Sequence, residues 1–261
     1  MPSESSGAPT LRILHQMART GGTVICRCLA SMQGVVLLSE IHPLGLKMFD
    51  PLRQAHEWYG LLTPKDLESI RSAPLNFRAA IRLIATRCSE QGRLLVIRDW
   101  SHLDYTGVPF TGPAEHSRLV EAVAPDFTLL RHATVRHPLD QWLSLSGKPV
   151  FRQHLGPRRF LKGAARFADS AAAIGFTRYE DFTRDSDAAL ERICRHLKIP
   201  FDAGYRNRWA DYDNMTGDVL PGRSDGKIQS LPRRQADEQT VAAFQALPGY
   251  RHVLMTLGYD E

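Results

Sequence analysis

The chain has 261 residues, of which 43% are hydrophobic and 23% are charged, a composition that excludes collagen-like, coiled-coil and wholly disordered proteins. Its formal charge of +5 at pH 7 favours anionic partners, but no basic tail, RNP-like aromatic run or Cys/His finger indicates binding to nucleic acid. Its four cysteines form no CxxC pair, so we expect free thiols in a reducing compartment and no zinc site.

Short apolar runs alternate with longer amphipathic ones along the chain, a pattern that predicts βαβ units around a parallel sheet. The chain is long enough to bury one α/β core without disulfides or metals. We therefore expect a disordered tail over residues 1–10 and a single domain over residues 11–261. Strands are expected over residues 11–16, 35–39, 94–98, 127–135 and 176–179.

The amphipathic runs are delimited by residues that start and stop helices. The clearest start is Thr63, followed by Pro64 at the first helical position and by Asp66 as a capping partner. Helices are expected over residues 22–32, from residue 64 onward, and over residues 76–91, 113–124, 138–146, 158–173, 187–197 and 236–247. Residues 205–234 contain several glycines and prolines and are expected to form a long ordered loop, which in a compact domain is more often functional than idle.

Membrane and export signals are not evident in the sequence. No apolar run approaches the roughly 18 residues that a helix needs to cross a bilayer. The first nine residues lack the basic segment and apolar stretch of a signal peptide. We therefore expect no membrane span and a cytoplasmic protein.

The first predicted strand leads through the run QMARTGGT, residues 16–23, directly into a helix. Such a glycine-containing turn favours anion binding, because the N–H groups at the helix start point outward and the helix dipole adds positive potential. The pattern of P-loop nucleotidases, GxxxxGK followed by Ser or Thr, is not met, since Gly22 stands where the lysine belongs. This argues against ATP hydrolysis, and a tight turn without any ligand is the alternative.

The run RTGGT, residues 19–23, resembles a loop of the PAPS-dependent sulfotransferase family, where PAPS is 3′-phosphoadenosine 5′-phosphosulfate. That loop reads as a basic residue, Ser or Thr, Gly, a small hydroxyl residue and Thr, and the chain matches four of the five positions. Gly22 departs from the pattern and lacks the hydroxyl. The resemblance implies an α/β, three-layer P-loop-like fold with a central, mainly parallel sheet flanked by helices on both faces.

A second match lies more than a hundred residues later, in the run VRHPLDQWLS, residues 135–144. In the family, an Arg at a strand end and a Ser eight residues later bind the 3′-phosphate of the cofactor, and Arg136 and Ser144 hold that spacing. The setting is physically reasonable: Pro138 opens a helix, and helical side chains lean toward the N-terminus, so Ser144 can face the same anion as Arg136.

Further cofactor contacts are implied by the resemblance alone. The loop residues Arg19, Thr20, Gly21, Gly22 and Thr23 would grip the 5′-phosphosulfate. Tyr179, in the run RYEDF, would lie near the adenine and the phosphates. In the late loop, Arg223 and Ser224 would lie over the 3′-phosphate.

The implied reaction moves a sulfuryl group from PAPS to a hydroxyl or amine and releases adenosine 3′,5′-bisphosphate. Arg19 would stabilise the charge that develops on the leaving phosphate oxygen, and no metal is required. The acceptor would be a small molecule, a glycan or a peptide. It would be bound by residues 44–72, 105–112 and 148–156, where Trp58, Tyr59, Trp100, Tyr105 and Phe110 either line an apolar pocket or belong to the core.

A base must take the proton of the acceptor, and two residues compete for this role. Glu40 follows the second predicted strand, and family branches that act on protein tyrosine or heparan sulfate use a glutamate. His102 follows the third strand, where other branches use a histidine, and Asp99 is a further possibility. We rank Glu40 first.

Two other functions remain open at this point. A nucleotide-dependent small-molecule kinase would share the fold and the first loop, but the Walker lysine and a clear acidic metal ligand are not found in the sequence. A noncatalytic anion-binding or interaction module would keep the loop without the base, and Gly22 keeps that possibility open.

Overall fold

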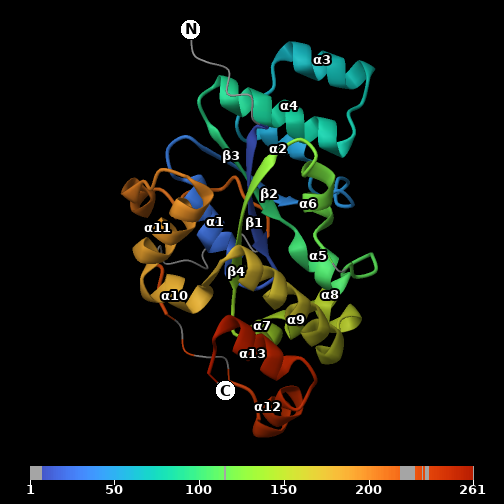
Figure 1. The fold of residues 1–261 in the computed structure, drawn as a ribbon, viewed down its shortest axis with the longest axis vertical. Helices are drawn as coiled ribbons and strands as arrows, with labels where there is room; N and C mark the ends of the chain where they lie inside the picture. Colours follow the sequence, from blue (N-terminus) through green and yellow to red (C-terminus); the bar gives the residue numbers. More distant parts are fainter. Residues whose placement is uncertain (1–7, 115, 218–226, 231, 233–234, 261) are drawn as a thin grey trace.

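The computed structural model describes residues 8–114, 116–217, 227–230, 232 and 235–260. At its centre lies a five-stranded sheet of order β2-β3-β1-β4-β5, in which all neighbouring strands run parallel (Figure 1). The strands are β1 (Thr10–Gln16), β2 (Val35–Ile41), β3 (Leu94–Asp99), β4 (Thr128–Val135) and β5 (Phe176–Arg178). The five predicted strands and the parallel sheet are confirmed. The first strand begins at Thr10, inside the predicted tail, of which residues 1–7 lie outside the described part.

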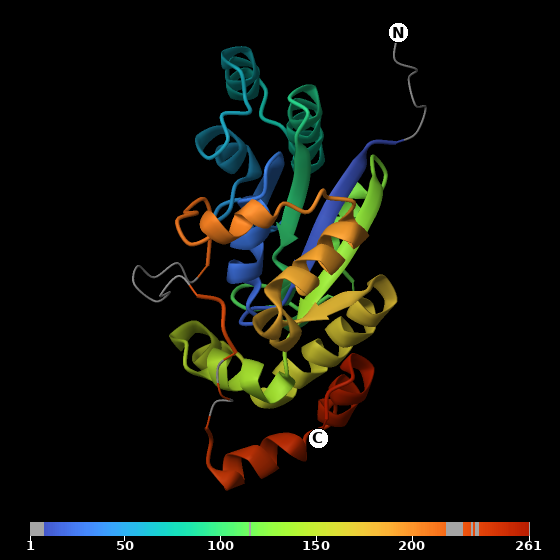
Figure 2. The same ribbon diagram turned by 90° about the vertical axis from the view of Figure 1, so that its left-hand side faces the viewer.

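One face of the sheet is covered by α1 (Gly22–Ala30), α10 (Tyr179–Arg184), α11 (Ser186–Leu197) and the 3₁₀ turn η1 (Ala203–Asn207). Their apolar side chains pack on Leu14, Leu37 and Val96 of the strands. Figure 2 shows α11 in front of the sheet. Because α11 buries one face against the sheet, its apolar residues recur every three or four positions, and this periodicity predicts the helix from the sequence.

The opposite face is covered by α2 (Pro51–Glu57), α4 (Phe77–Glu90), α6 (Arg118–Val123) and α9 (Pro157–Ile174). Here Ile13, Leu38 and Ile97 pack against α2, α4 and α6, whereas Ala133 and Val135 contact the cluster that contains α9. Because both faces are covered, the strands are apolar on both sides, as parallel strands are. The remaining helices are α3 (Pro64–Ser72), α5 (Ser101–Thr106), α7 (Pro138–Ser146), α8 (Pro149–His154), α12 (Glu238–Gln245) and α13 (Tyr250–Leu257).

The helix after β1 packs on one face, while the helices after the neighbouring strands β3 and β4 pack on the other. In open α/β sheets such a change of side marks the point where ligands bind, at the carboxyl ends of the strands. We therefore expect a ligand to bind to the segments that follow β1, β2, β3 and β4. None of the described helices is long and apolar enough to cross a membrane.

Several predicted helices are confirmed in detail. Thr63 and Asp66 form the capping box of α3, and α7 has the predicted ends. The predicted helix over residues 113–124 is wrong in its first half: the chain leaves α5 through Gly107 in the left-handed region, with φ 73°, and α6 starts only after its cap, Ser117. The last predicted helix, residues 236–247, is confirmed as α12, whereas α13, which begins after Gly249 with φ 91°, was not predicted.

Besides α13, four short helices were not predicted: α2, α5, α8 and α10. Each has seven residues or fewer, too short for a periodic pattern to be recognised. Two of them begin with proline, Pro51 and Pro149, and Asp50 caps the first of these, which is the signal that could have revealed it. The predicted loop over residues 205–234 begins inside η1, and its residues 218–226 lie outside the described part.

His132 of β4 provides a pH-dependent contribution to stability. It is buried, its Nε2 lies 2.9 Å from Thr177 Oγ1, and its ring centroid lies 5.0 Å from that of His196 in α11. Burial lowers the pKa of His132 to about 3, and the charges of His196 and Arg192 act in the same direction. The folded protein therefore holds this histidine neutral where the unfolded chain would protonate it.

We expect the free energy of unfolding to fall as the pH is lowered from about 6.5 toward 4, because the unfolded chain then binds more protons at His132 than the folded protein does. The upper limit for this one group is about 1.4 kcal/mol per pH unit. Urea denaturation at pH 7, 6 and 5 would measure the slope. His132→Gln, which can keep the contact with Thr177, should flatten it, and an unchanged slope would contradict the assignment.

Candidate functional site

The loop between β1 and α1 has the backbone of an anion-binding turn. Arg19 and Gly21 lie in the left-handed region, with φ values of 70° and 78°. The hydroxyl of Thr20 donates to the carbonyl of Met17 at 2.9 Å and closes the turn. Helix α1 then begins at Gly22 with no side chain capping its N-terminus, so its first N–H groups are available to an anion.

Gly21 lies directly beneath the ring of Tyr179, the first residue of α10. A Cβ atom at Gly21 would stand 2.0 Å from Tyr179 Cδ2, so both the φ angle and the ring require glycine here. The guanidinium of Arg136, at the end of β4, lies 5.0 Å from the centre of the same ring. The predicted residues Gly21, Tyr179 and Arg136 are therefore brought together.

Arg19 and Ser144 also meet at this loop. Arg19 Nε donates to Ser144 Oγ at 2.8 Å, and Arg136 Nη1 donates to the Arg19 carbonyl at 3.4 Å. Gln141 of α7 donates to the Ala18 carbonyl at 2.8 Å and ties the helix to the loop. Three polar side chains predicted from two distant motifs thus lie within one cluster.

Gly22, the position that departs from the family pattern, is explained by Gln16. A Cβ at Gly22 would stand 1.6 Å from Gln16 Oε1, so the carboxamide fills the space where a larger residue would place its side chain. Gln16 Oε1 in turn accepts a hydrogen bond from Arg98 Nε at 3.0 Å. The missing hydroxyl at position 22 and the presence of Gln16 are two parts of one local arrangement.

Arg98, at the carboxyl end of β3, was not selected from the sequence. Its side chain is buried and donates to Ser39 Oγ at 3.1 Å, to the Thr216 carbonyl at 3.0 Å and to Thr23 Oγ1 at 3.4 Å, besides Gln16. The signal that could have revealed it is an arginine that closes an otherwise apolar strand, LLVIR. Arg98 thus links β1, α1, β2 and the segment around residue 216.

Glu40 lies next to Arg98, in the last part of β2. Its φ of 57° is in the left-handed region, an unusual backbone for glutamate. Its Oε1 lies 3.6 Å from Arg98 Nη2, and its Oε2 accepts a hydrogen bond from Thr216 Oγ1 at 2.7 Å. Both carboxylate oxygens therefore already face partners within the protein.

His102 occupies the first turn of α5, between aromatic rings. Its imidazole lies edge-on to Trp100 and Phe151, with ring centroids at 5.3 and 5.7 Å. Among the residues that the structure describes, none forms a hydrogen bond with its ring nitrogens. Burial lowers the pKa of His102 to about 4, while the charge of Glu40 acts in the opposite direction, so the imidazole is neutral at pH 7.

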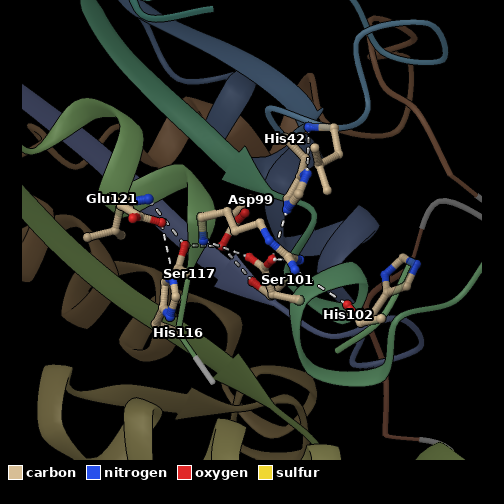
Figure 3. A network of polar contacts seen from close by, with 12 residues as sticks. His42, Asp99, Ser101, His102, His116, Ser117 and Glu121 are labelled. Carbon is tan, nitrogen blue, oxygen red and sulfur yellow. Dashed lines mark hydrogen bonds and ion pairs between the residues drawn. The ribbon is translucent and has the colours of Figure 1, made fainter. Parts of the chain in front are cut away.

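Asp99, the third base considered, belongs to a buried network below the site (Figure 3). Its Oδ2 lies 2.6 Å from His15 Nδ1 and accepts hydrogen bonds from Ser101 and Ser117 at 2.9 and 3.3 Å. Burial raises the pKa of Asp99, but the hydrogen bond and charge of His15 outweigh it, and the net pKa is lowered. In Figure 3 the imidazole of His102 points away from this carboxylate. Asp99 is therefore directed into the protein interior rather than toward an acceptor.

A second network holds α5 in place. His42 Nε2 lies 3.0 Å from Asp104 Oδ1, and because the Leu44 amide donates to His42 Nδ1 at 3.0 Å, it is Nε2 that carries the proton. Arg118 donates to the same carboxylate oxygen at 2.9 Å. These bonds fix the helix that carries His102.

Arg223 and Ser224, two of the expected cofactor contacts, lie outside the described residues. Within the described ranges there is no group of three or more His, Cys, Asp or Glu side chains that could hold a metal ion.

We expect Gly22→Ala to lower the free energy of unfolding by about 1–3 kcal/mol, because the added methyl group must displace the Gln16 carboxamide from Arg98. Urea denaturation would measure the loss. Gly147→Ala is a suitable control, since the nearest atom to a Cβ there is 3.9 Å away.

In a Gln16→Ala background the space at position 22 is open, so the same Gly22→Ala substitution should cost much less. A double-mutant cycle separates this coupling from the cost of each single change. Equal costs in the two backgrounds would contradict the steric explanation.

The completed geometry can be compared with known proteins. No protein-family model matches the sequence, and no curated protein matches it. Among solved structures, a sulfotransferase domain from the curacin biosynthetic pathway is similar, with a TM-score of 0.61 and 15% identity over 98% of this chain and 99% of that one. The sulfotransferase domain of the Synechococcus PCC 7002 olefin synthase is also similar, with a TM-score of 0.61 and 17% identity over 100% of this chain and 98% of that one. The chain therefore has a sulfotransferase fold, as its sequence motifs predicted.

Proposed function

We propose that this protein is a sulfotransferase that moves a sulfuryl group from PAPS to a hydroxyl or amine acceptor and releases adenosine 3′,5′-bisphosphate. The observation that carries the proposal is the cluster of Arg19, Arg136 and Ser144 beside a glycine turn, at the carboxyl end of the sheet. Two arginines and a hydroxyl within one cluster suit a ligand with two anionic ends. The sulfotransferase fold supports the same conclusion.

The donor set fits such a nucleotide. The backbone N–H groups at Gly21 and Gly22, with Thr23, would hold the 5′-phosphosulfate, while Thr20, whose hydroxyl donates to Met17, would keep the turn closed. Arg136 and Ser144 would hold the 3′-phosphate, and PAPS would supply the activated sulfuryl group.

Arg19 lies between these two groups of residues. The hydrogen bond from its Nε to Ser144 holds its guanidinium beside the glycine turn, where the leaving phosphate oxygen of the cofactor would lie. A fixed cation at this point stabilises developing negative charge without having to reorganise during the reaction. Tyr179 covers the glycine turn and, through its contact with Arg136, keeps that arginine at the same edge.

For the base, the contacts favour His102 over Glu40, the residue ranked first from the sequence. Glu40 is engaged by Thr216 and Arg98, whereas the ring nitrogens of His102 form no hydrogen bond with any described residue and its imidazole is neutral at pH 7. Glu40 would act as a positioning residue, because its charge favours the protonated form of His102.

We expect adenosine 3′,5′-bisphosphate to raise the melting temperature of the protein without magnesium. At about 100 times its dissociation constant it should add roughly 2.7 kcal/mol to the free energy of unfolding, a shift of several degrees. Stabilisation by ATP only with magnesium would instead favour a kinase, and a response to neither nucleotide would favour a noncatalytic module.

Arg136→Ala should weaken binding of the bisphosphate about 10- to 100-fold while changing the affinity for 5′-AMP little, because only the former carries the 3′-phosphate. Isothermal titration calorimetry would measure both affinities. Arg53→Ala, at an exposed arginine of α2 that pairs with Glu57, is the matched control and should leave both unchanged. Equal losses for the two nucleotides in Arg136→Ala would remove Arg136 from this role.

His102→Gln should lower kcat about 10²- to 10⁴-fold with little change in affinity for the bisphosphate, as the loss of a general base does. Glu40→Gln keeps an acceptor for Thr216 but removes the charge, so the acidic limb of the pH–rate profile should move to lower pH. Because the pKa of His102 lies at about 4, steady-state kinetics from pH 3 to pH 9 would measure both effects. Full turnover in His102→Gln together with loss of turnover in Glu40→Gln would identify Glu40 as the base.

A further inference from the structure

Most of the exposed apolar side chains of the described residues lie on three segments of the chain. Seven large hydrophobic side chains are exposed, and five of them lie on three segments that follow β2, α5 and α7. These five, here called the apolar rim, are Leu44 (50% exposed), Leu46 (38%), Met48 (51%), Phe110 (50%) and Val150 (41%). The other two, Leu75 and Met255, belong to the α3–α4 connection and to α13. Such a concentration of exposed apolar groups is typical of a binding surface.

The three segments meet around Trp100 and His102. The rings of Phe49 and Phe110 lie edge-on to Trp100, with centroids at 5.0 and 5.7 Å, and Phe151 approaches His102. The backbone of Gly45 is so close to Trp100 that a Cβ there would stand 3.0 Å from the indole. Figure 1 shows α5, which carries His102, next to α8, which carries Val150. The segments that carry the rim therefore meet the two rings, Trp100 and Phe151, that lie against the imidazole that we propose as the base.

The composition of these segments restricts what they can bind. They read PLGLKMF over residues 43–49, GVPFTG over 107–112 and KPVF over 148–151. Their polar side chains are limited to Lys47, Thr111 and Lys148, and none of the three contains Asp, Glu, Asn, Gln or Ser. Glycan hydroxyls must exchange water for hydrogen bonds with polar side chains when they are buried, and these segments offer too few such partners. An alkyl or aromatic body, in contrast, gains by being removed from water.

We propose that the acceptor is an apolar alcohol, in which a hydroxyl is carried on an alkyl body, and that this body lies on the apolar rim with its hydroxyl at His102. The inference rests on the proposed function and names the substrate class of the same site. The acceptor, rather than a second copy of the chain, is the occupant because the rim is continuous with the rings that enclose the His102 imidazole.

The test uses linear primary alcohols from butanol to decanol as acceptors with PAPS. We expect kcat/KM to rise about three- to fourfold per added methylene, the equivalent of about 0.8 kcal/mol per buried CH₂. Phe110→Ser and Leu44→Ser should flatten this dependence and leave the affinity for the bisphosphate unchanged. Leu75→Ser, at an exposed leucine away from the rim, is the matched control and should keep the wild-type dependence.

Binding of decanol, followed by saturation-transfer NMR, provides a readout that does not depend on turnover. A signal lost in Phe110→Ser but kept in Leu75→Ser supports the proposal, and an equal signal in both overturns it. Hexoses that are sulfated as efficiently as decanol would also overturn it, as would dimerisation of the wild type, measured by light scattering, that Phe110→Ser abolishes. Bisphosphate binding that fails while decanol still binds at the rim would overturn the proposed function rather than the apolar site.

Discussion

The buried guanidinium of Arg98 is the interaction on which the arrangement of the site depends. A charge removed from water costs several kcal/mol unless hydrogen bonds and opposite charge replace the solvent. Here the replacement comes from Gln16, Ser39 and the Thr216 carbonyl, with Glu40 supplying the negative charge. These partners belong to β1, to β2 and to a segment nearly 120 positions after Arg98. The hydrogen bonds that this one buried cation needs therefore hold three distant parts of the chain together.

This constraint also accounts for a departure from the expected motif. The carboxamide of Gln16 must reach Arg98, and its path passes over the first residue of α1, where only glycine leaves room. Gly22 is therefore explained by the packing of Gln16 beneath the loop. The N–H groups at the start of α1 still have no side-chain cap. A changed motif residue need not indicate a lost function when the neighbouring side chain explains it.

Two buried networks support the carboxyl edge of the sheet from below. One joins His15, Ser101 and Ser117 through Asp99, and the other joins His42 and Arg118 through Asp104. Asp99 accepts a hydrogen bond from Ser101 of α5, and Asp104 is itself part of α5, so this short helix gains from tertiary contacts the stability that six residues cannot supply alone. The rigidity of His102 and of the rings around it follows from these bonds.

Local sequence determined the strands, most of the long helices and the glycine turn, because hydrophobic periodicity, caps and positive-φ glycines act within a few residues of chain. It also placed Arg19 and Arg136 at strand ends, which in a parallel sheet lie along one edge. Only the tertiary structure decided that Arg98 is central, that Glu40 is engaged by Thr216, and that Asp99 turns inward. Those outcomes depend on which polar groups meet across the fold, and a buried charge takes its role from neighbours that are far away in the sequence.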